Sequence, residues 1–225
     1  QRFGISHVHI KHVYKALQKR NHDFFREMFN ETLATVKNDI PKQFYDRFKP
    51  IYLLDSTFLE YCIARVFFAS FGYSSTLGKI VQGTKLHTLY DLSRDYIGKV
   101  KITGGRYHDS PQSESMLKDL ENCIVIFDKA YHKVKRFKKL DKRNVLFVIP
   151  LRKNIEVDDK LTIEVKVAED KVVITHGELS NGLNVIVVKT PEITLMSNAV
   201  NCNWYELVAL YQFRGYIEVF FRMLK

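Results

Sequence analysis

The sequence predicts a mixed α/β protein in which helices flank a sheet, and three features carry this prediction. Short apolar runs that read as strands, at 51–55, 123–128 and 145–150, alternate with segments of helical character. Residues 154–198 then supply several alternating β segments, and a helical pattern closes the chain. Strands interleaved with helices are typical of layered α/β architectures.

The first elements are a basic helical region and a β-meander. Residues 1–50 read as helical and basic, and we expect this region to be incomplete because the chain begins at Gln1. Residues 51–150 form the predicted first part of the core. Within them, 76–92 and 96–103 have the pattern of consecutive antiparallel strands.

A helix is predicted next, over SPQSESMLKDLE (110–121). Ser110 is the candidate N-cap and Pro111 the first helical residue, where a proline is tolerated. His108 and Asp109 come just before this helix. They could form a pair that supports a site from behind, but we interpret them as residues that stabilise the turn.

The remaining elements are a basic helix, a β-rich insertion and a final helix. The helix is predicted over 129–143, and the insertion over 151–200. Asn181 and Gly182 predict a hairpin within the insertion. Residues 203–225 are predicted to form one long helix within the last part of the core, 201–225.

The composition favours a polyanionic partner. Thirty-five Lys and Arg against twenty-five Asp and Glu leave a net charge of +10, which suits nucleic acid better than an acidic small molecule. The three cysteines form no C-x-x-C pair, so neither a disulfide framework nor a zinc ribbon is indicated and a cytoplasmic location is expected. No apolar run is long enough to span a bilayer, so no membrane partner is expected.

Two acids follow apolar runs that read as strands: Asp55 in YLLDST and Asp128 in IVIFDKAY. Either could simply cap the turn or helix that follows. Strand ends in α/β sheets are also where ligands and metals collect, and a carboxylate is costly to bury alone. If Glu218 joins them, the three like charges make sense mainly around divalent cations, and oxygen ligands suit Mg²⁺ or Mn²⁺.

The last helix has a narrow polar stripe beside an apolar face. At 100° per residue, Tyr211, Arg214, Glu218 and Lys225 lie at roughly 0°, 300°, 340° and 320°. The apolar residues fall between roughly 180° and 280° by the same arithmetic: Phe213, Ile217, Phe220, Phe221 and Leu224. Taken alone, the stripe is typical of the solvated face of an amphipathic helix.

Taken together, these motifs resemble the bacterial DDE transposases of the insertion-sequence-four family. The resemblance rests on Y-x2-R-x3-E-x6-K in the last helix, on LLDST and IFDKAY, and on the supporting stretches KLHTLYDL and ITGGRYHDS. It runs from about residue 50 to Lys225. Gly215 stands where the family commonly has Trp, and Ala130 stands where Gly is frequent. Because the chain ends on the signature Lys, we expect a truncated C-terminus.

The resemblance implies a ribonuclease H-like fold with a two-metal site for phosphoryl transfer that cuts and joins transposon-end DNA. Asp55, Asp128 and Glu218 would be its first, second and third acids, holding two Mg²⁺ ions for which Mn²⁺ can substitute. Tyr211 and Arg214, with Lys225, would contact DNA phosphates near the cleaved end. The family also implies a hairpin intermediate, a homodimer when two ends are synapsed, and a nucleoid-associated protein of the bacterial cytoplasm.

A basic patch after Asp128 is a second candidate DNA contact. Lys129, Lys133 and Arg136 belong to it, although a run of charge is often only a solvated helix face. Two other functions stay open at this stage. One is a domesticated or inactive relative that binds DNA without cutting it, and the other is a ribonuclease H-like nuclease that hydrolyses strands without joining them.

Overall fold

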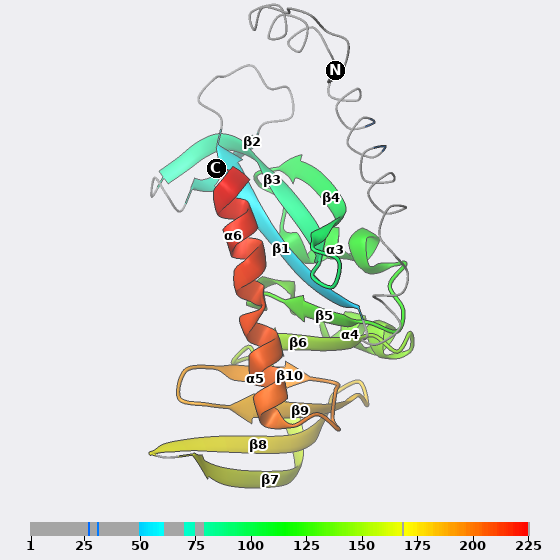
Figure 1. The fold of residues 1–225 in the computed structure, drawn as a ribbon, viewed down its shortest axis with the longest axis vertical. Coiled ribbons are helices and arrows are strands. Elements are labelled where there is room, and N and C mark those ends of the chain that lie inside the picture. The colour runs from blue at the N-terminus through cyan, green and yellow to red at the C-terminus, as the bar shows by residue number, and fades with distance from the viewer. Residues whose placement is uncertain are drawn as a thin grey trace, which may run out of the picture. The chain divides into compact units, whose positions relative to one another are not determined.

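One large mixed sheet organises the part of the chain that carries the predicted site. The computed structural model describes residues 27, 31, 50–60, 70–74, 79–167 and 169–224. The chain divides into two compact units, Gln1–Phe44 and Tyr45–Lys225, and the fold described below belongs to the second. Its sheet has ten strands, ordered β2-β3-β1-β5-β6-β10-β9-β8-β7, with β4 paired to β3 (Figure 1).

The centre of the sheet mixes parallel and antiparallel pairing. β1 is parallel to β5, β5 is parallel to β6, and β3 runs antiparallel to both β1 and β4. The antiparallel β3 and β4 confirm the predicted meander. The bounds of this part are β1 Ile51–Glu60, β2 Ser70–Ser74, β3 Lys79–Asp91, β4 Tyr96–Gly104, β5 Ile124–Phe127 and β6 Leu146–Pro150.

The β-rich segment after β6 extends the same sheet. Its strands are β7 Val157–Val167, β8 Asp170–Leu179, β9 Asn184–Lys189 and β10 Thr194–Ser197. β10 pairs with β6 and carries β9, β8 and β7 outward in antiparallel order. The predicted hairpin between β8 and β9 is confirmed: Gly182 has a φ of 76°, and the Leu183 amide donates to the Asn181 side chain.

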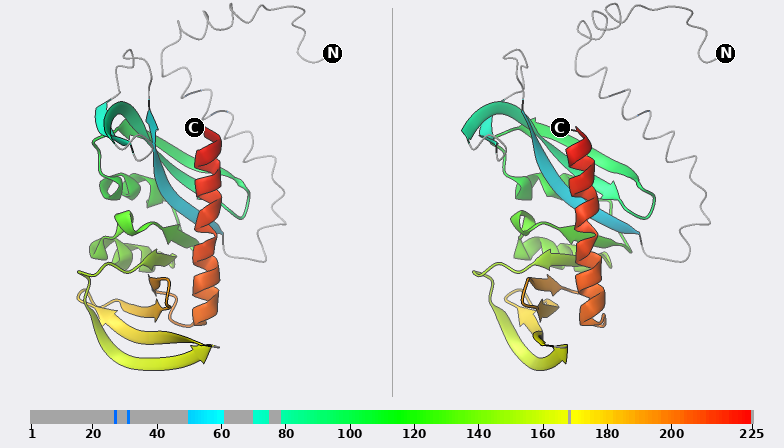
Figure 2. Two further views of the ribbon diagram at one scale, coloured as in Figure 1. Left: turned by 90° about the vertical axis from the view of Figure 1, so that its left-hand side faces the viewer. Right: turned by 60° about the vertical axis from the view of Figure 1, so that its left-hand side comes forward.

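Helices cover both faces of the sheet, as Figure 2 shows. α3 (Asp109–Leu117), the 3₁₀ turn η2 (Lys129–Tyr131) and α4 (Val134–Asp141) lie on one face, and α5 (Trp204–Gln212) and α6 (Arg214–Leu224) lie on the other. None of the helices within the described residues has the length and apolar character of a membrane-spanning segment.

The alternation of side chains along β5 explains why both faces are covered. Val125 and Phe127 join the cluster that contains Met116 of α3 and Phe137 of α4. Ile126 joins the cluster on the opposite face with residues of α6. Neighbouring side chains of a strand point to opposite faces, so a strand that is apolar at every position must be buried on both.

Asp55 does not end its strand, and this part of the prediction was wrong. β1 continues to Glu60, and Ser56 pairs with His87 of β3 in register. The residues after Asp55 keep the β-sheet alternation because β3 is long enough to pair with all of them. The acid therefore lies within a central strand, and only Asp128 directly follows one.

Two helix boundaries also differ from the prediction. α3 begins at Asp109 with His108 as the N-cap residue, two positions before the predicted N-cap Ser110. Pro111 remains within the first turn, where no intrahelical N–H bond is lost. The final helix is interrupted at Phe213, so that α5 and α6 are separate helices following one course (Figure 1).

Candidate active site

The first acid, Asp55, is held on the face of β1 that α6 covers. Its neighbour two residues earlier, Leu53, packs with Ile217 and Phe221 of α6. Asp55 itself is 8% exposed, and one of its oxygens, Oδ1, accepts the Ser56 amide hydrogen at 2.8 Å. Burial is the main reason why the pKa of this carboxyl rises to about 6, and the attraction of Arg214 opposes the rise.

The second acid, Asp128, lies beside Asp55 because β1 and β5 are parallel and in register. Leu54 pairs with Phe127, so the residue that follows each of them reaches the same place on the sheet. Asp128 precedes η2 in an extended conformation, but its side chain makes no capping hydrogen bond. The capping role considered from the sequence is therefore not what this carboxylate does.

The third acid, Glu218, reaches the same place from α6 and is joined to the others by Arg214. Arg214 Nη1 lies 2.8 Å from Glu218 Oε1, one turn along the helix. Its other terminal nitrogen, Nη2, lies 3.3 Å from Asp55 Oδ2 and 3.8 Å from Asp128 Oδ1. One guanidinium thus touches three carboxylates that are far apart in the sequence.

Tyr211 belongs to the same charge environment. Burial raises the pKa of its phenol, Asp128 and Asp55 raise it further, and Arg214 lowers it. The polar stripe predicted on the last helix therefore exists, in spite of the interruption at Phe213. Arg214 of this stripe reaches the acids of the sheet, whereas Glu218 is also exposed to solvent, and Lys225 lies outside the described residues.

The predicted basic patch is divided by the structure. Lys129 is exposed directly after Asp128, and Lys133 is about half exposed while its ammonium group pairs with Glu114 at 3.2 Å. Arg136, in contrast, is 2% exposed, and its guanidinium donates to the Tyr131 carbonyl and the Ser110 side chain. The expected DNA contact of Arg136 is corrected accordingly: its charge holds α3 and η2 together.

A group that the sequence reading assigned to a turn lies close to Asp55 in space. Asp109 accepts a hydrogen bond from Ser56 Oγ at 2.7 Å and pairs with Lys85 of β3 at 3.2 Å. Its charge is one of those that raise the pKa of Asp55. Two weak sequence signals pointed to such a role: the adjacent His108 and Asp109, and the place of ITGGRYHDS in the family resemblance. Neither identified the partners of Asp109, which are distant along the chain.

The donor set of the site fits hard divalent cations. Its three carboxylates offer only oxygen ligands, which Mg²⁺ prefers. Asp55 and Asp128 already approach one guanidinium nitrogen, so two of the acids can share a single cation. In the described part of the chain, no three His, Cys, Asp or Glu side chains are arranged closely enough to form a ready-made metal site. Arg214 supplies the positive charge among the acids.

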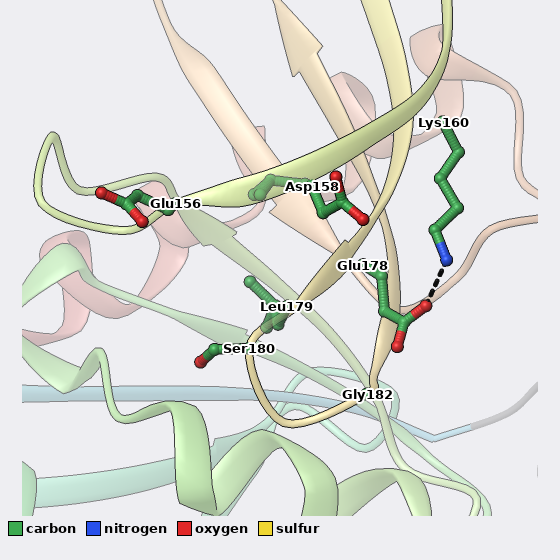
Figure 3. A pocket seen from close by; sticks show the side chains of 8 residues that line it. Glu156, Asp158, Lys160, Glu178, Leu179, Ser180 and Gly182 are labelled. Carbon is green, nitrogen blue, oxygen red and sulfur yellow. Dashed lines mark hydrogen bonds and ion pairs between the residues drawn. The ribbon is translucent and has the colours of Figure 1, made fainter.

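A separate pocket lies in the outer part of the sheet and has a different character. It has a volume of about 650 Å³ and lies where β7 begins and β8 ends, next to the β8–β9 turn, and Glu156, Asp158 and Glu178 line it (Figure 3). Lys160 forms an ion pair with Glu178. β5, β6, β10 and β9 separate these strands from β1. Because three of the four charged residues that line it are acidic, this pocket is poorly suited to DNA phosphates.

An α/β sheet that gathers three carboxylates and an arginine in this way defines a candidate phosphoryl-transfer protein. Residues 46–225 match the family described as the transposase DDE domain, and the chain belongs to that family. The chain is also similar to the probable transposase for insertion sequence element IS5377 of Geobacillus stearothermophilus. The two are 23% identical over 236 residues, which cover 99% of this chain and 60% of that protein's length.

Proposed function

We propose that this chain is the catalytic core of a DDE transposase of the insertion-sequence-four kind, which cuts and joins transposon-end DNA. The observation that carries the proposal is the convergence of Asp55, Asp128 and Glu218 on Arg214. Family membership and the net charge of +10 support a DNA substrate.

A ribonuclease H-like fold is part of the proposal. The strand order β4-β3-β1-β5-β6 supports it, with β3 antiparallel to its neighbours and the other central strands parallel. This arrangement brings the middle of β1 and the end of β5 together beneath α6. The strands β7 to β10 continue the sheet beyond β6, so they do not cover the middle of β1 and the end of β5.

The three acids would hold two Mg²⁺ ions, with Asp55 shared between them and Asp128 and Glu218 each completing one. When bound, such a pair of ions activates a water or a 3′-hydroxyl and stabilises the leaving oxygen in an in-line displacement. Asp55 suits the shared position because its backbone is fixed within a central strand and its Oδ1 is oriented by the Ser56 amide.

Arg214 would bind the DNA phosphate next to the reacting bond. Its planar fork can donate two parallel hydrogen bonds to phosphate oxygens, as it now donates to carboxylates. Tyr211 would donate one further hydrogen bond, and Lys225 a point charge. Lys129 and Lys133 would contact the DNA backbone nearby, and synapsis of two ends would require at least two copies of the protein.

Cleavage of DNA by acid-to-amide variants tests the proposal. The substrate is a supercoiled plasmid that carries the genomic DNA flanking the coding sequence on both sides, incubated with Mg²⁺ or Mn²⁺. We expect Asp55→Asn, Asp128→Asn and Glu218→Gln each to lower cleavage by roughly 10³-fold, because each removes charge stabilisation at the reacting phosphate. Asp158→Asn, an exposed acid of β7, is the control and should cleave normally.

The DNA products of this cleavage assay also distinguish the alternative functions. Joined strands support a transposase, whereas products that are only hydrolysed indicate a nuclease with the same site. DNA that is bound but left intact by the wild-type protein indicates an inactive relative. Undiminished cleavage by Glu218→Gln would contradict the proposed site itself.

A further inference from the structure

Behind Asp55, on the opposite face of β1, lies a second polar cluster centred on Asp109. Side chains alternate along a strand, so Ser56 points away from α6 and toward α3. Its hydroxyl donates to Asp109 Oδ1 at 2.7 Å, and Lys85 Nζ lies 3.2 Å from the same oxygen. His87 Nδ1 is 3.5 Å from this oxygen as well, with the ring fully buried.

These contacts connect four elements of the core. Asp109 is the first residue of α3, Ser56 belongs to β1, and Lys85 and His87 belong to β3. His87 also forms a 2.8 Å hydrogen bond through Nε2 to Thr103 Oγ1 of β4. An acid in the first turn of a helix is favourable in any protein, but that preference does not explain why three side chains of the sheet are aimed at it.

The cluster is linked to the catalytic acid through a single residue. Ser56 directs its side chain to Asp109 and its backbone N–H to Asp55 Oδ1, at 2.8 Å. The same residue pairs with His87 in the β1–β3 register. Burial raises the pKa of the Tyr131 phenol, and the charges of Asp109 and Asp55 raise it further.

We propose that Asp109 is a positioning residue for Asp55: by holding the Ser56 side chain, it fixes the strand segment whose amide orients the Asp55 carboxylate. This inference rests on the proposed function, since it assigns Asp55 a role at the reacting phosphate. Asp109 itself lies on the far face of the sheet and does not touch the DNA or the cations. Its effect is therefore expected in the chemical step and in cation affinity, and not in DNA affinity.

The first test compares Asp109→Asn with Asp119→Asn in the full chain. Asp119 also pairs with a lysine of the sheet, Lys99 at 2.7 Å, but it is exposed beyond the end of α3. We expect Asp109→Asn to lower kcat by about 10- to 100-fold with an unchanged KM for plasmid DNA, as for residues that orient metal ligands. Mn²⁺ binding by the DNA-free protein, followed by electron paramagnetic resonance, should weaken about tenfold. Asp119→Asn should alter neither quantity.

A second test uses Ser56 and separates positioning from general stability. Ser56→Ala should lose kcat as Asp109→Asn does, and Ser56→Thr, which keeps the hydroxyl, should restore most of the loss. If both residues act through one hydrogen bond, the kcat of the double variant Ser56→Ala/Asp109→Asn should be no lower than that of the less active single variant. The Ser56 pair also serves if the Asp109 variant fails to fold.

Wild-type kcat and Mn²⁺ affinity in Asp109→Asn would overturn the inference, and so would equal activity of Ser56→Ala and Ser56→Thr. Asp55→Asn, assayed in parallel, distinguishes a failure of the positioning role from a failure of the proposed function. If Asp55→Asn is inactive while Asp109→Asn is normal, only the positioning role fails. If Asp55→Asn cleaves normally, the proposed function fails as well.

Discussion

The two faces of β1 carry polar clusters with opposite balances of charge. On the α6 face, three carboxylates surround one guanidinium, that of Arg214. On the α3 face, a single carboxylate, Asp109, is surrounded by Ser56, Lys85 and His87. On the α3 face the charge of Asp109 is balanced by Lys85. The α6 face keeps an excess of negative charge, which a divalent cation can neutralise.

The largest expected effect on the α6 face is the destabilisation of the fold when the buried Asp55 carboxyl ionises. Its folded-state pKa, about 6, lies above its ordinary value of 3.8, so between these values the folded protein binds more protons than the unfolded chain. Stability therefore falls as the pH rises from about 4 to 6, by roughly 3 kcal/mol in total. Asp55→Asn should remove this loss and be more stable than wild type above pH 6, as urea unfolding without metal can measure.

If Asp55→Asn is instead less stable than wild type at pH 7, the ionised carboxylate stabilises the fold and the charge excess on the α6 face is refuted. At about pH 3 the two proteins should have similar stability, because the wild-type carboxyl is then largely protonated in both the folded and the unfolded state. That comparison at low pH serves as the internal control.

The opposite pH dependence is expected from the α3 face. Burial, helped by Lys85 and Lys101, lowers the pKa of His87 to about 4, although Asp109 opposes the shift. Between about 4 and 6.5 the unfolded chain binds more protons, so this group makes stability rise with pH, by roughly 3 kcal/mol. His87→Gln, which can still reach Thr103, should flatten that rise in urea unfolding measured across the same range.

His132 is a second buried histidine whose pKa burial lowers to about 4, so part of the rise should remain in His87→Gln. In the wild-type protein the contributions of the histidines and of Asp55 oppose each other in one pH window. A pH profile of His87→Gln that is indistinguishable from that of wild type would show that His87 is not held neutral by its surroundings.

Removal of Arg214 should have a somewhat smaller effect. Arg214→Gln leaves the three acids without their shared cation, and we expect a loss of about 1–3 kcal/mol, the usual range for hydrogen bonds to charged groups. The loss should be greater at pH 8 than at pH 5, because Asp55 is ionised only at the higher pH. Arg222→Gln, an exposed cation on the same helix, is the matched control in thermal or urea unfolding. Equal losses in the two variants would contradict the bridging role.

The smallest effect is expected at the exposed lysine beside the site. Lys129→Ala should weaken DNA binding to a similar extent for all sequences and reduce the slope of log K against log salt concentration by about one. Fluorescence anisotropy with duplex DNA at several salt concentrations measures this. Arg136→Lys offers a contrast, because its buried guanidinium should matter for folding and leave the salt slope unchanged. An unaltered slope for Lys129→Ala would exclude a phosphate contact.

Periodicity made part of the site predictable. An apolar run followed by an acid gives Asp128 directly, because β5 ends where its hydrophobic residues end. Helical spacing places Arg214 and Glu218 on one stripe, and their 2.8 Å contact follows from a separation of four residues. Asp55 was identified as a site residue, but its position within a strand was not, since the length of β1 depends on its pairing with β3.

Periodicity could not predict contacts between segments that are distant in the sequence. Arg136 looked like every other cation of its helix, and only the packing of α3 against η2 buries it. Asp109 looked like a turn residue because its partners, Ser56 and Lys85, are distant in the chain. The sequence does not show whether a charged side chain is buried, because burial depends on the tertiary fold. Burial in turn decides whether the side chain can contact a partner at the surface or stabilises the core.

The sequence by itself determined the class of the fold, the acids and the polar stripe that meets them, because these depend on local period and on the order of apolar runs. The tertiary structure decided that the acids converge on Arg214, that β7 to β10 continue the central sheet, and that Asp109 supports Asp55 from behind. The physical reason is that β-sheet pairing and burial bring together residues that are far apart in the chain, and such contacts produce no periodic pattern in the sequence.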